Sequence, residues 1–231
     1  MNAYRKYEFP DRNFPLGIVQ MDTQGPTSLH RHEFEELTII TSGSGKHLYE
    51  RKTYDISAGD VFTVKPGMRH GYPETDDLRL TNILFISAGL GIESEDLDDI
   101  SGYHVLFDLE PRYRTRTGFR SRLRLNPAQL SCLMAMVDSL KSELSTAKPG
   151  YRFMALTELR RIIGYLSRSY SGASGRNTRS MIIISKAIRH MESNLAGELD
   201  IPGLASASCV SESTLLRAFK DCTGLSPVRY L

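Results

Sequence analysis

The sequence predicts an α+β protein in three parts: a small β-barrel over residues 1–125, a helical hairpin over 126–170 and, after a linker at 171–180, an all-α helix-turn-helix segment over 181–231. Two observations support this division. Short runs of β-branched and aromatic residues, broken by Gly and Pro, fill the first part and are typical of a barrel or sandwich. After Asn126, apolar residues recur with the 3.6-residue period of amphipathic helices.

The composition is that of a globular protein. Of the 231 residues, 40% are hydrophobic and 24% are charged, which excludes disorder as the overall state. No stretch approaches the ~20 consecutive apolar residues of a membrane span, and the first residues lack the apolar block of a signal peptide. We therefore expect a cytoplasmic protein with no membrane partner. Three widely spaced cysteines predict neither disulfides nor a thiolate metal site, and we expect them to be reduced and mostly buried.

Charge is unevenly distributed along the chain. The net charge is +2, but residues 126–231 are basic and residues 1–125 slightly acidic. A basic half fits an anionic partner, although a solvated surface gives the same pattern. The run from Arg112 to Arg124 is densely basic, and we interpret it as a solvated sheet edge rather than an anion site. We expect residues 87–104, which are acidic and show little pattern, to form a loop on the outside.

Candidate metal ligands gather in the segment from His30 to Glu36. Alternate side chains of a strand share a face, so His30, His32 and Glu36 point to one interior if no bulge intervenes. His70 follows a Pro-Gly turn that can bring the next hairpin alongside. Three imidazoles and a carboxylate can hold a divalent transition metal. The sequence thus contains a candidate metal site made of His30, His32, Glu36 and His70.

A polar pocket without a metal is the alternative for the same residues. Imidazole and carboxylate groups also match the hydroxyl groups of a sugar, and aromatic rings can stack on its face. On this interpretation the effector pocket consists of His30, His32, Glu36, Tyr49, Phe62, His70 and Tyr72.

The spacing of these residues resembles the two motifs of the cupin superfamily. The first motif is carried by His30, His32, Glu36 and Gly43, and the second by Gly59, Asp60, Pro66, Gly67 and His70. The resemblance covers residues 15–90 and implies a β-barrel with an internal pocket. In metal-dependent cupins the two histidines of the first motif, its glutamate and the histidine of the second bind the metal. Many sensory cupins bind a small ligand without one.

Capping signals place the helices of the second half. Asn126-Pro127 begins the first helix of the hairpin, and Lys148-Pro-Gly150 ends it. The hairpin leaves an apolar face for the barrel or a second subunit, and we expect a homodimer. Asp200 and Ser211 are suitable N-cap residues for two short helices separated by a brief turn. This is the layout of a helix-turn-helix whose second helix enters the major groove of DNA.

The last segment resembles the first helix-turn-helix of the AraC family of bacterial transcription regulators. The resemblance is carried by Leu204, Ala205, Ser211, Leu215, Arg217, Phe219, Lys220, Gly224, Ser226, Pro227, Tyr230 and Leu231. The order of barrel, hairpin and helix-turn-helix looks most like the rhamnose-responsive members. The family has two helix-turn-helix units joined by a long helix. The sequence ends where that helix begins, so we expect a truncated chain without the second unit.

The resemblance also assigns DNA contacts to the second short helix. Ser213 and Arg217 are expected at base edges, and Ser211, Thr214 and Lys220 nearer the phosphates. Arg217 is the strongest candidate because a guanidinium can pair bidentately with guanine. The alternative is that Arg217 is an ordinary solvated helix residue.

Together these features predict a ligand-responsive transcription regulator that binds promoter DNA and senses a small molecule, most simply a sugar, and that is not an enzyme. The alternative is a metal-dependent cupin enzyme acting on a small polar substrate, for which a helix-turn-helix has no obvious use. A third possibility is a truncated regulator that dimerises and binds its effector without holding DNA.

Overall fold

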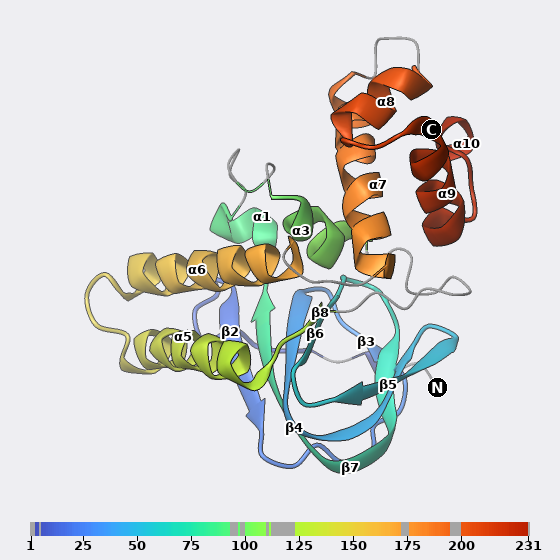
Figure 1. Cartoon of the computed structure of the whole chain (residues 1–231). Coiled ribbons are helices and arrows are strands. Elements are labelled where there is room, and N and C mark those ends of the chain that lie inside the picture. The colour runs from blue at the N-terminus through green and yellow to red at the C-terminus, as the bar shows by residue number, and fades with distance from the viewer. Residues whose placement is uncertain are drawn as a thin grey trace.

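The computed structural model describes residues 3–4, 6–92, 97, 100–109, 111, 123–171, 176–194 and 200–230. Its strands form a barrel, two antiparallel helices lie along one side of the barrel, and the C-terminal helices stand at one end of it (Figure 1). The predicted fold class is therefore confirmed.

The described part of the barrel contains eight strands. They are β1 (Ala3–Tyr4), β2 (Leu16–Met21), β3 (His30–Arg31), β4 (Glu35–Tyr49), β5 (Lys52–Ser57), β6 (Asp60–Val64), β7 (His70–Phe85) and β8 (Leu123–Arg124). Strand β7 pairs antiparallel with β2, β3 and β4, and β4 also pairs with β5 and β6. The β3–β7 register sets His30 opposite His70, so two histidines distant in sequence become neighbours.

Alternation along β4 and β7 separates two buried faces. Leu37 pairs with Ile83, and both belong to the apolar core that faces the helices. The next residues in register, Glu36 with Leu84 and Thr38 with Asn82, point the other way because side chains alternate on a strand. Glu36, Thr38 and Asn82 therefore line the barrel interior, although most of their neighbours on β4 and β7 are apolar.

The hairpin consists of α5 (Pro127–Thr146) and α6 (Tyr151–Ser171). Asn126 caps α5 in a reciprocal capping box with Gln129, as the Asn-Pro signal predicts. Gly150, just before α6, has a φ of +85°, a conformation that glycine adopts without strain. Apolar side chains of the two helices join the main core, among them Leu133, Val137, Leu140, Leu159, Ile162 and Leu166.

The segment after β7 departs from its prediction as an outer loop. It forms α1 (Ser87–Leu90), α3 (Ser101–His104) and η1 (Val105–Leu109), a single turn of π-helix. Helix α3 packs tightly on α6, since a Cβ on Gly102 would lie 2.0 Å from the carbonyl oxygen of Ser167. Val105 and Leu106 are fully buried. Within the predicted loop itself Leu90 and Ile92 are buried, and the acidic composition of that segment concealed them. Of the arginine-rich run, residues 112–122 lie outside the described residues, and Arg124 on β8 forms an ion pair with Asp60.

The C-terminal part contains α7 (Arg176–Ser193), α8 (Ile201–Ala207), α9 (Glu212–Thr223) and α10 (Pro227–Tyr230). Helix α7 begins at Arg176, so residues 176–180, predicted as linker, are helical. One apolar core runs from the barrel through the hairpin to α7 and α9, with Ile184 and Phe219 at its far end.

Two further observations bear on the sequence-based expectations. All three cysteines are free, but Cys132 and Cys209 are exposed rather than buried. In the described part of the chain, no helix combines the length and the apolar character needed to cross a bilayer.

Candidate functional site

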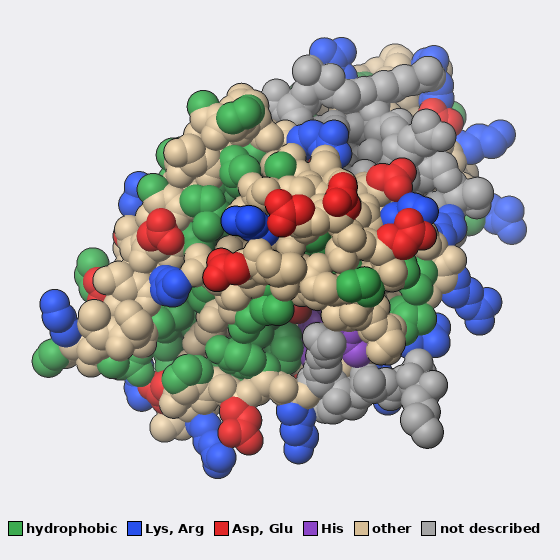
Figure 2. Space-filling view, turned by 90° about the horizontal axis from the view of Figure 1, so that it is seen from below, with side chains coloured by type: hydrophobic (Ala, Val, Ile, Leu, Met, Phe, Trp, Pro, Cys, Tyr) green, Lys and Arg blue, Asp and Glu red, His purple; other side chains and the backbone are tan. Residues whose placement is uncertain are grey.

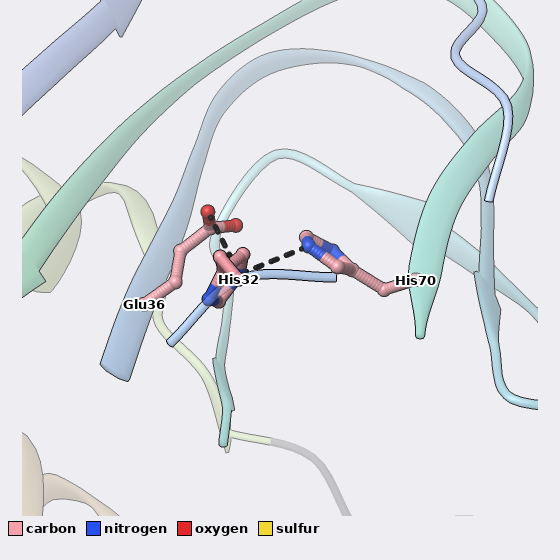
Figure 3. A group of neighbouring side chains, drawn as sticks. All are labelled: His32, Glu36 and His70. Carbon is pink, nitrogen blue, oxygen red and sulfur yellow. Dashed lines mark hydrogen bonds and ion pairs between the residues drawn. The ribbon is translucent and has the colours of Figure 1, made fainter. Parts of the chain in front are cut away.

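A cluster of buried histidines and one glutamate lies inside the barrel (Figure 3). The Nε2 atom of His32 lies 3.1 Å from Nε2 of His70 and 3.6 Å from Oε2 of Glu36. His32 and His70 are each 1% exposed and Glu36 is 5% exposed. The three residues come from the turn after β3 and from the first residues of β4 and β7, so three separate segments converge.

Backbone contacts fix the orientation and protonation of His32. Its Nδ1 lies 2.8 Å from the carbonyl oxygen of Phe34, and its ring stacks on that phenylalanine with centroids 4.1 Å apart. A carbonyl oxygen only accepts, so Nδ1 carries the proton and Nε2 presents a lone pair. The Nε2 of His70 must then donate in the 3.1 Å contact. Burial, and secondarily the charge of His30, lowers the pKa of His32 to about 4, which keeps this imidazole neutral at pH 7.

Glu36 supplies the negative charge of the cluster. Its Oε1 accepts a hydrogen bond from the Thr38 hydroxyl, and its Oε2 faces His32. A carboxylate and an imidazole lone pair therefore point to one small volume. The carboxylate and the imidazole nitrogen can accept hydrogen bonds from ligand hydroxyl groups, or together they can bind a cation.

The distances between the donor atoms of the cluster also fit a divalent metal ion. The donor atoms of His32, Glu36 and His70 lie within 4.8 Å of one another. Ligands bound at ~2.0–2.1 Å to one ion are separated by about 3.0–3.4 Å, close to the observed distances. The Nδ1–H of His32 bonded to a backbone carbonyl is the outer contact that orients a ligating histidine. These three residues fit a metal ion.

The cluster forms one wall of a cavity of about 150 Å³. Histidine side chains are visible at an opening when the molecule is seen from below (Figure 2). Lys6 and Tyr7 of the N-terminal segment, Gln24 and Asn82 contribute polar atoms to the lining. The Asn82 Oδ1 atom is buried and accepts no hydrogen bond from the described residues. The volume is below the ~300–1,000 Å³ typical of ligand pockets, so it suits a small ligand.

Five of the predicted pocket residues line this cavity, namely His30, His32, Glu36, His70 and Tyr72. His30 is separate from the three-residue metal cluster. Its Nδ1 lies 3.0 Å from the carbonyl oxygen of Ser28, and its ring is 4.3 Å from that of His70. The condition of an uninterrupted strand from His30 to Glu36 is not met, because β3 ends at Arg31 and β4 begins at Glu35. All three side chains nevertheless line this cavity.

Tyr49 and Phe62 do not line the cavity and belong instead to a second apolar cluster of the barrel. The Tyr49 hydroxyl donates to the carbonyl oxygen of Pro111, 3.3 Å away, which holds the ring in the core. Phe62 stacks on His47 with ring centroids 4.5 Å apart. We predicted that these two rings stack on a sugar. They lie instead behind the cavity wall, where they support it.

The prediction missed several residues in and near the cavity, among them His47, Asn82 and Phe34. His47 is 1% exposed and its ring lies 5.7 Å from that of His70. Asn82 and Phe34 line the cavity. A signal existed for Asn82, since a polar residue interrupts the apolar strand Leu80–Phe85. His47 shares a strand face with Tyr49, two residues on. Phe34 gave no signal, because its stacking on His32 depends on the turn between β3 and β4.

Helix α9 presents its predicted residues on the outside. The Ser211 side chain caps the helix by accepting from the backbone N–H of Thr214, and Gly224 ends it in the left-handed conformation. Ser213, Arg217 and Lys220 are exposed, and their spacing of four and three residues places them on one face. Thr214 is half-buried, with its hydroxyl 2.9 Å from that of Ser211.

The opposite face of α9 is core. Leu215 and Phe219 are completely buried, as expected. Phe219 also meets Tyr230 of α10 edge to face, with centroids 5.9 Å apart. The polar face of α9 is therefore held outward by an anchored apolar face.

The chain is similar to a known family and to several known proteins. Residues 16–163 match the family described as the AraC-like ligand binding domain. The HTH-type transcriptional activator RhaS of Citrobacter koseri is 29% identical, over 96% of this chain and 76% of the relative. RhaS of Escherichia coli strain K12/DH10B is 28% identical with the same coverage.

Two solved structures are also similar. The AraC-like transcriptional activator CuxR aligns with a TM-score of 0.39 at 13% identity, covering 90% of this chain and 72% of CuxR. ToxT from Vibrio cholerae aligns with a TM-score of 0.32 at 16% identity, covering 93% and 96% of the two chains.

Proposed function

Because the chain belongs to the AraC-like ligand-binding family, we propose that it is a ligand-responsive transcription regulator that binds promoter DNA. The observation that carries the proposal is the presence, on one chain, of the buried His32–Glu36–His70 cavity and of α9 with an exposed polar face. The relatives matched over 96% of the chain are transcriptional activators, which supports a regulatory rather than a catalytic role. Promoter binding would place the protein in the bacterial cytoplasm.

The effector we propose is a small polyhydroxylated molecule, most simply a monosaccharide. The cavity of about 150 Å³ leaves room for little more than one ring. Its acceptors include Glu36 and the buried Oδ1 of Asn82, and such acceptors pair with hydroxyl donors. His30, His32, His70 and Tyr72 complete the lining, with Tyr49 and Phe62 behind it. Displacement of Lys6 and Tyr7, which line the cavity from the N-terminal segment, would admit a larger ring.

On α9 we propose that Arg217 and Ser213 contact base edges, while Ser211, Thr214 and Lys220 contact the phosphate backbone. The exposed fork of Arg217 can reach guanine, whereas the Ser211 side chain already serves as the helix cap. A helix N-terminus also favours phosphate, since its backbone N–H groups point outward.

Dimerisation through the hairpin would bring two copies of α9 to two half-sites. Phe153 is 74% exposed and Met154 44% exposed at the start of α6, and these side chains offer an apolar contact for a second copy. The core that continues from the barrel to α9 gives effector binding a route to the DNA-reading face. Binding would act by shifting the population of arrangements that engage both half-sites.

A metal-dependent enzyme is the second candidate, and the three converging donors favour it. His32, Glu36 and His70 would hold the metal, which would supply Lewis-acid polarisation of a bound substrate. Metal analysis of the purified protein separates the two functions. Stoichiometric metal together with turnover that is lost in His32→Ala would support the enzyme, whereas effector binding that survives chelation supports the regulator.

DNA binding is the direct test of the regulator. We expect the full chain to bind a fragment from upstream of its own gene with an affinity that falls as salt rises. Arg217→Ala should weaken this binding, and Arg168→Ala, which removes an exposed arginine from α6, is the matched control. If no salt-sensitive binding is seen with or without added sugars, the proposal is wrong.

A further inference from the structure

A second cavity, with a volume of about 360 Å³, lies where the barrel meets the hairpin. Phe14, Leu16 and Ile18 line it from the barrel side, and Leu144 lines it from α5. Phe14 and Leu16 are buried members of the main core. The volume lies within the ~300–1,000 Å³ range of small-molecule sites and exceeds that of the histidine cavity. This joint cavity is distinct from the histidine cavity, and the two linings share only Tyr7 among the described residues.

The lining of the joint cavity contains one basic and one acidic side chain, Lys141 and Asp11. Lys141 of α5 lies at the rim, and its Nζ donates to the side-chain oxygen of Gln20, a neutral group. The acidic residue in the lining is Asp11, whose carboxylate is held by Arg152 at 2.6 Å and by the Tyr151 hydroxyl at 2.5 Å. The Asp11 carboxylate is therefore already held by Arg152, by the Tyr151 hydroxyl and by the backbone N–H of Asn13, whereas the Lys141 ammonium group donates to a neutral partner. The rim suits an anionic head group.

We propose that the joint cavity binds an amphipathic carboxylate of medium chain length. The hydrocarbon tail lies against Phe14, Leu16 and Leu144, and the carboxylate accepts a charge-assisted hydrogen bond from Lys141. The histidine cavity suits such a ligand poorly, because its Glu36 carboxylate would repel the anion.

Tyr7 gives this site a physical connection to the histidine cavity. Its side chain lines both cavities, and its ring lies 6.1 Å from that of Phe34, which stacks on His32. A Cβ at position 17 would lie 2.5 Å from the Tyr7 hydroxyl, so Gly17 makes room for this ring. A ligand in the joint cavity therefore contacts the wall of the histidine cavity from behind. Occupancy of one site should alter the affinity of the other by the same factor in both directions.

The test uses the full chain, calorimetric titration and two probes of equal length, octanoate and octanol. We expect octanoate to bind about tenfold more tightly than octanol, equivalent to ~1.4 kcal/mol, because the carboxylate accepts a charge-assisted hydrogen bond from a lysine that is exposed to water. Lys141→Gln should remove this preference. Lys148→Gln, which neutralises an exposed lysine of the α5–α6 turn outside the lining, should retain it. Absence of octanoate binding, or an unchanged preference in Lys141→Gln, overturns the proposal.

A second variant tests whether the hydrocarbon tail of the probe binds in the joint cavity. Leu144→Trp fills the cavity from α5, and we expect it to abolish binding of both probes while the circular dichroism spectrum remains that of the unaltered chain. If the spectrum changes, Ile18→Phe fills the cavity from β2 instead. Octanoate binding that persists in a folded, cavity-filled variant would show that the probe sits elsewhere and would overturn the assignment.

Discussion

The barrel cavity and helix α9 hold their polar residues in opposite environments. His32, Glu36 and His70 are at most 5% exposed and contact one another. Ser213, Arg217 and Lys220 are exposed on a helix whose other face is anchored in the core. Interactions of buried polar groups are strong because little water screens them, whereas those of exposed charges weaken with salt. The cavity should therefore respond to protonation and ligand chemistry, and α9 to ionic strength.

Removal of the α9 anchor should have the largest effect on stability. Phe219→Ala truncates a completely buried ring, and we expect a loss of about 3–5 kcal/mol in the free energy of unfolding. Leu216→Ala, at a neighbouring position 41% exposed, should cost under about 1 kcal/mol. Chemical denaturation of both variants measures the difference. Equal losses would show that α9 is not held through Phe219.

Acid should destabilise the chain through His32. Above its ordinary pKa of 6.5, this imidazole is neutral in both the folded and unfolded chains. As the pH falls from 6.5 towards about 4, the unfolded chain binds a proton that the folded chain excludes, so the free energy of unfolding decreases. The loss reaches about 3 kcal/mol at ~1.36 kcal/mol per pH unit.

His32→Gln removes this titration. Its free energy of unfolding should therefore fall less steeply than that of the unaltered chain over the same pH range. Parallel curves from urea denaturation at several pH values would contradict the assignment of a neutral, buried His32.

Glu36→Gln should weaken effector binding about tenfold or more, because it replaces a charged acceptor by a neutral one. A thermal-shift screen of monosaccharides identifies the ligand, and calorimetry then compares the two chains. Glu33→Gln changes an exposed glutamate three residues earlier and should bind as the unaltered chain does. Equal affinity of all three chains would remove Glu36 from the site.

Two changes on α9 should separate base contacts from phosphate contacts. We expect Arg217→Ala to cost ~1–3 kcal/mol in DNA affinity and to relax specificity at one base position. Lys220→Ala should weaken binding to all sequences uniformly and reduce the slope of log K against log salt by about 1. Binding measured at several salt concentrations, on the native site and on single-base variants, distinguishes them. Identical behaviour of the two variants would refute the assignment.

Local signals predicted much of the fold. Asn126, Asp200 and Ser211 cap helices as expected, because capping depends on residues three or four positions away. The helical parts of residues 87–104 were misjudged because their order depends on distant partners, such as Ser167 beneath Gly102. For the same reason the start of α7 could not be placed at Arg176.

The candidate site was predictable in its chemistry but less so in its geometry. The spacing of His32, Glu36 and His70 indicated a shared interior, where the structure places them. The pairing of β3 with β7 sets His30 opposite His70, and the spacing did not indicate the break between β3 and β4 at residues 32–34. Tyr49 and Phe62 have the correct residue type and burial, but their distance from the cavity is set by the pairing of β4 with its neighbours.

The central claim is that effector binding in the barrel is linked to DNA binding through α9. The most direct test measures the affinity of the full chain for its upstream DNA with and without the monosaccharide that stabilises it, together with its affinity for the monosaccharide with and without the DNA. Linkage predicts that both affinities change by the same factor, and that the factor returns to one in Glu36→Gln, which no longer holds the effector. A monosaccharide that binds in the cavity but leaves the DNA affinity unchanged would contradict the account.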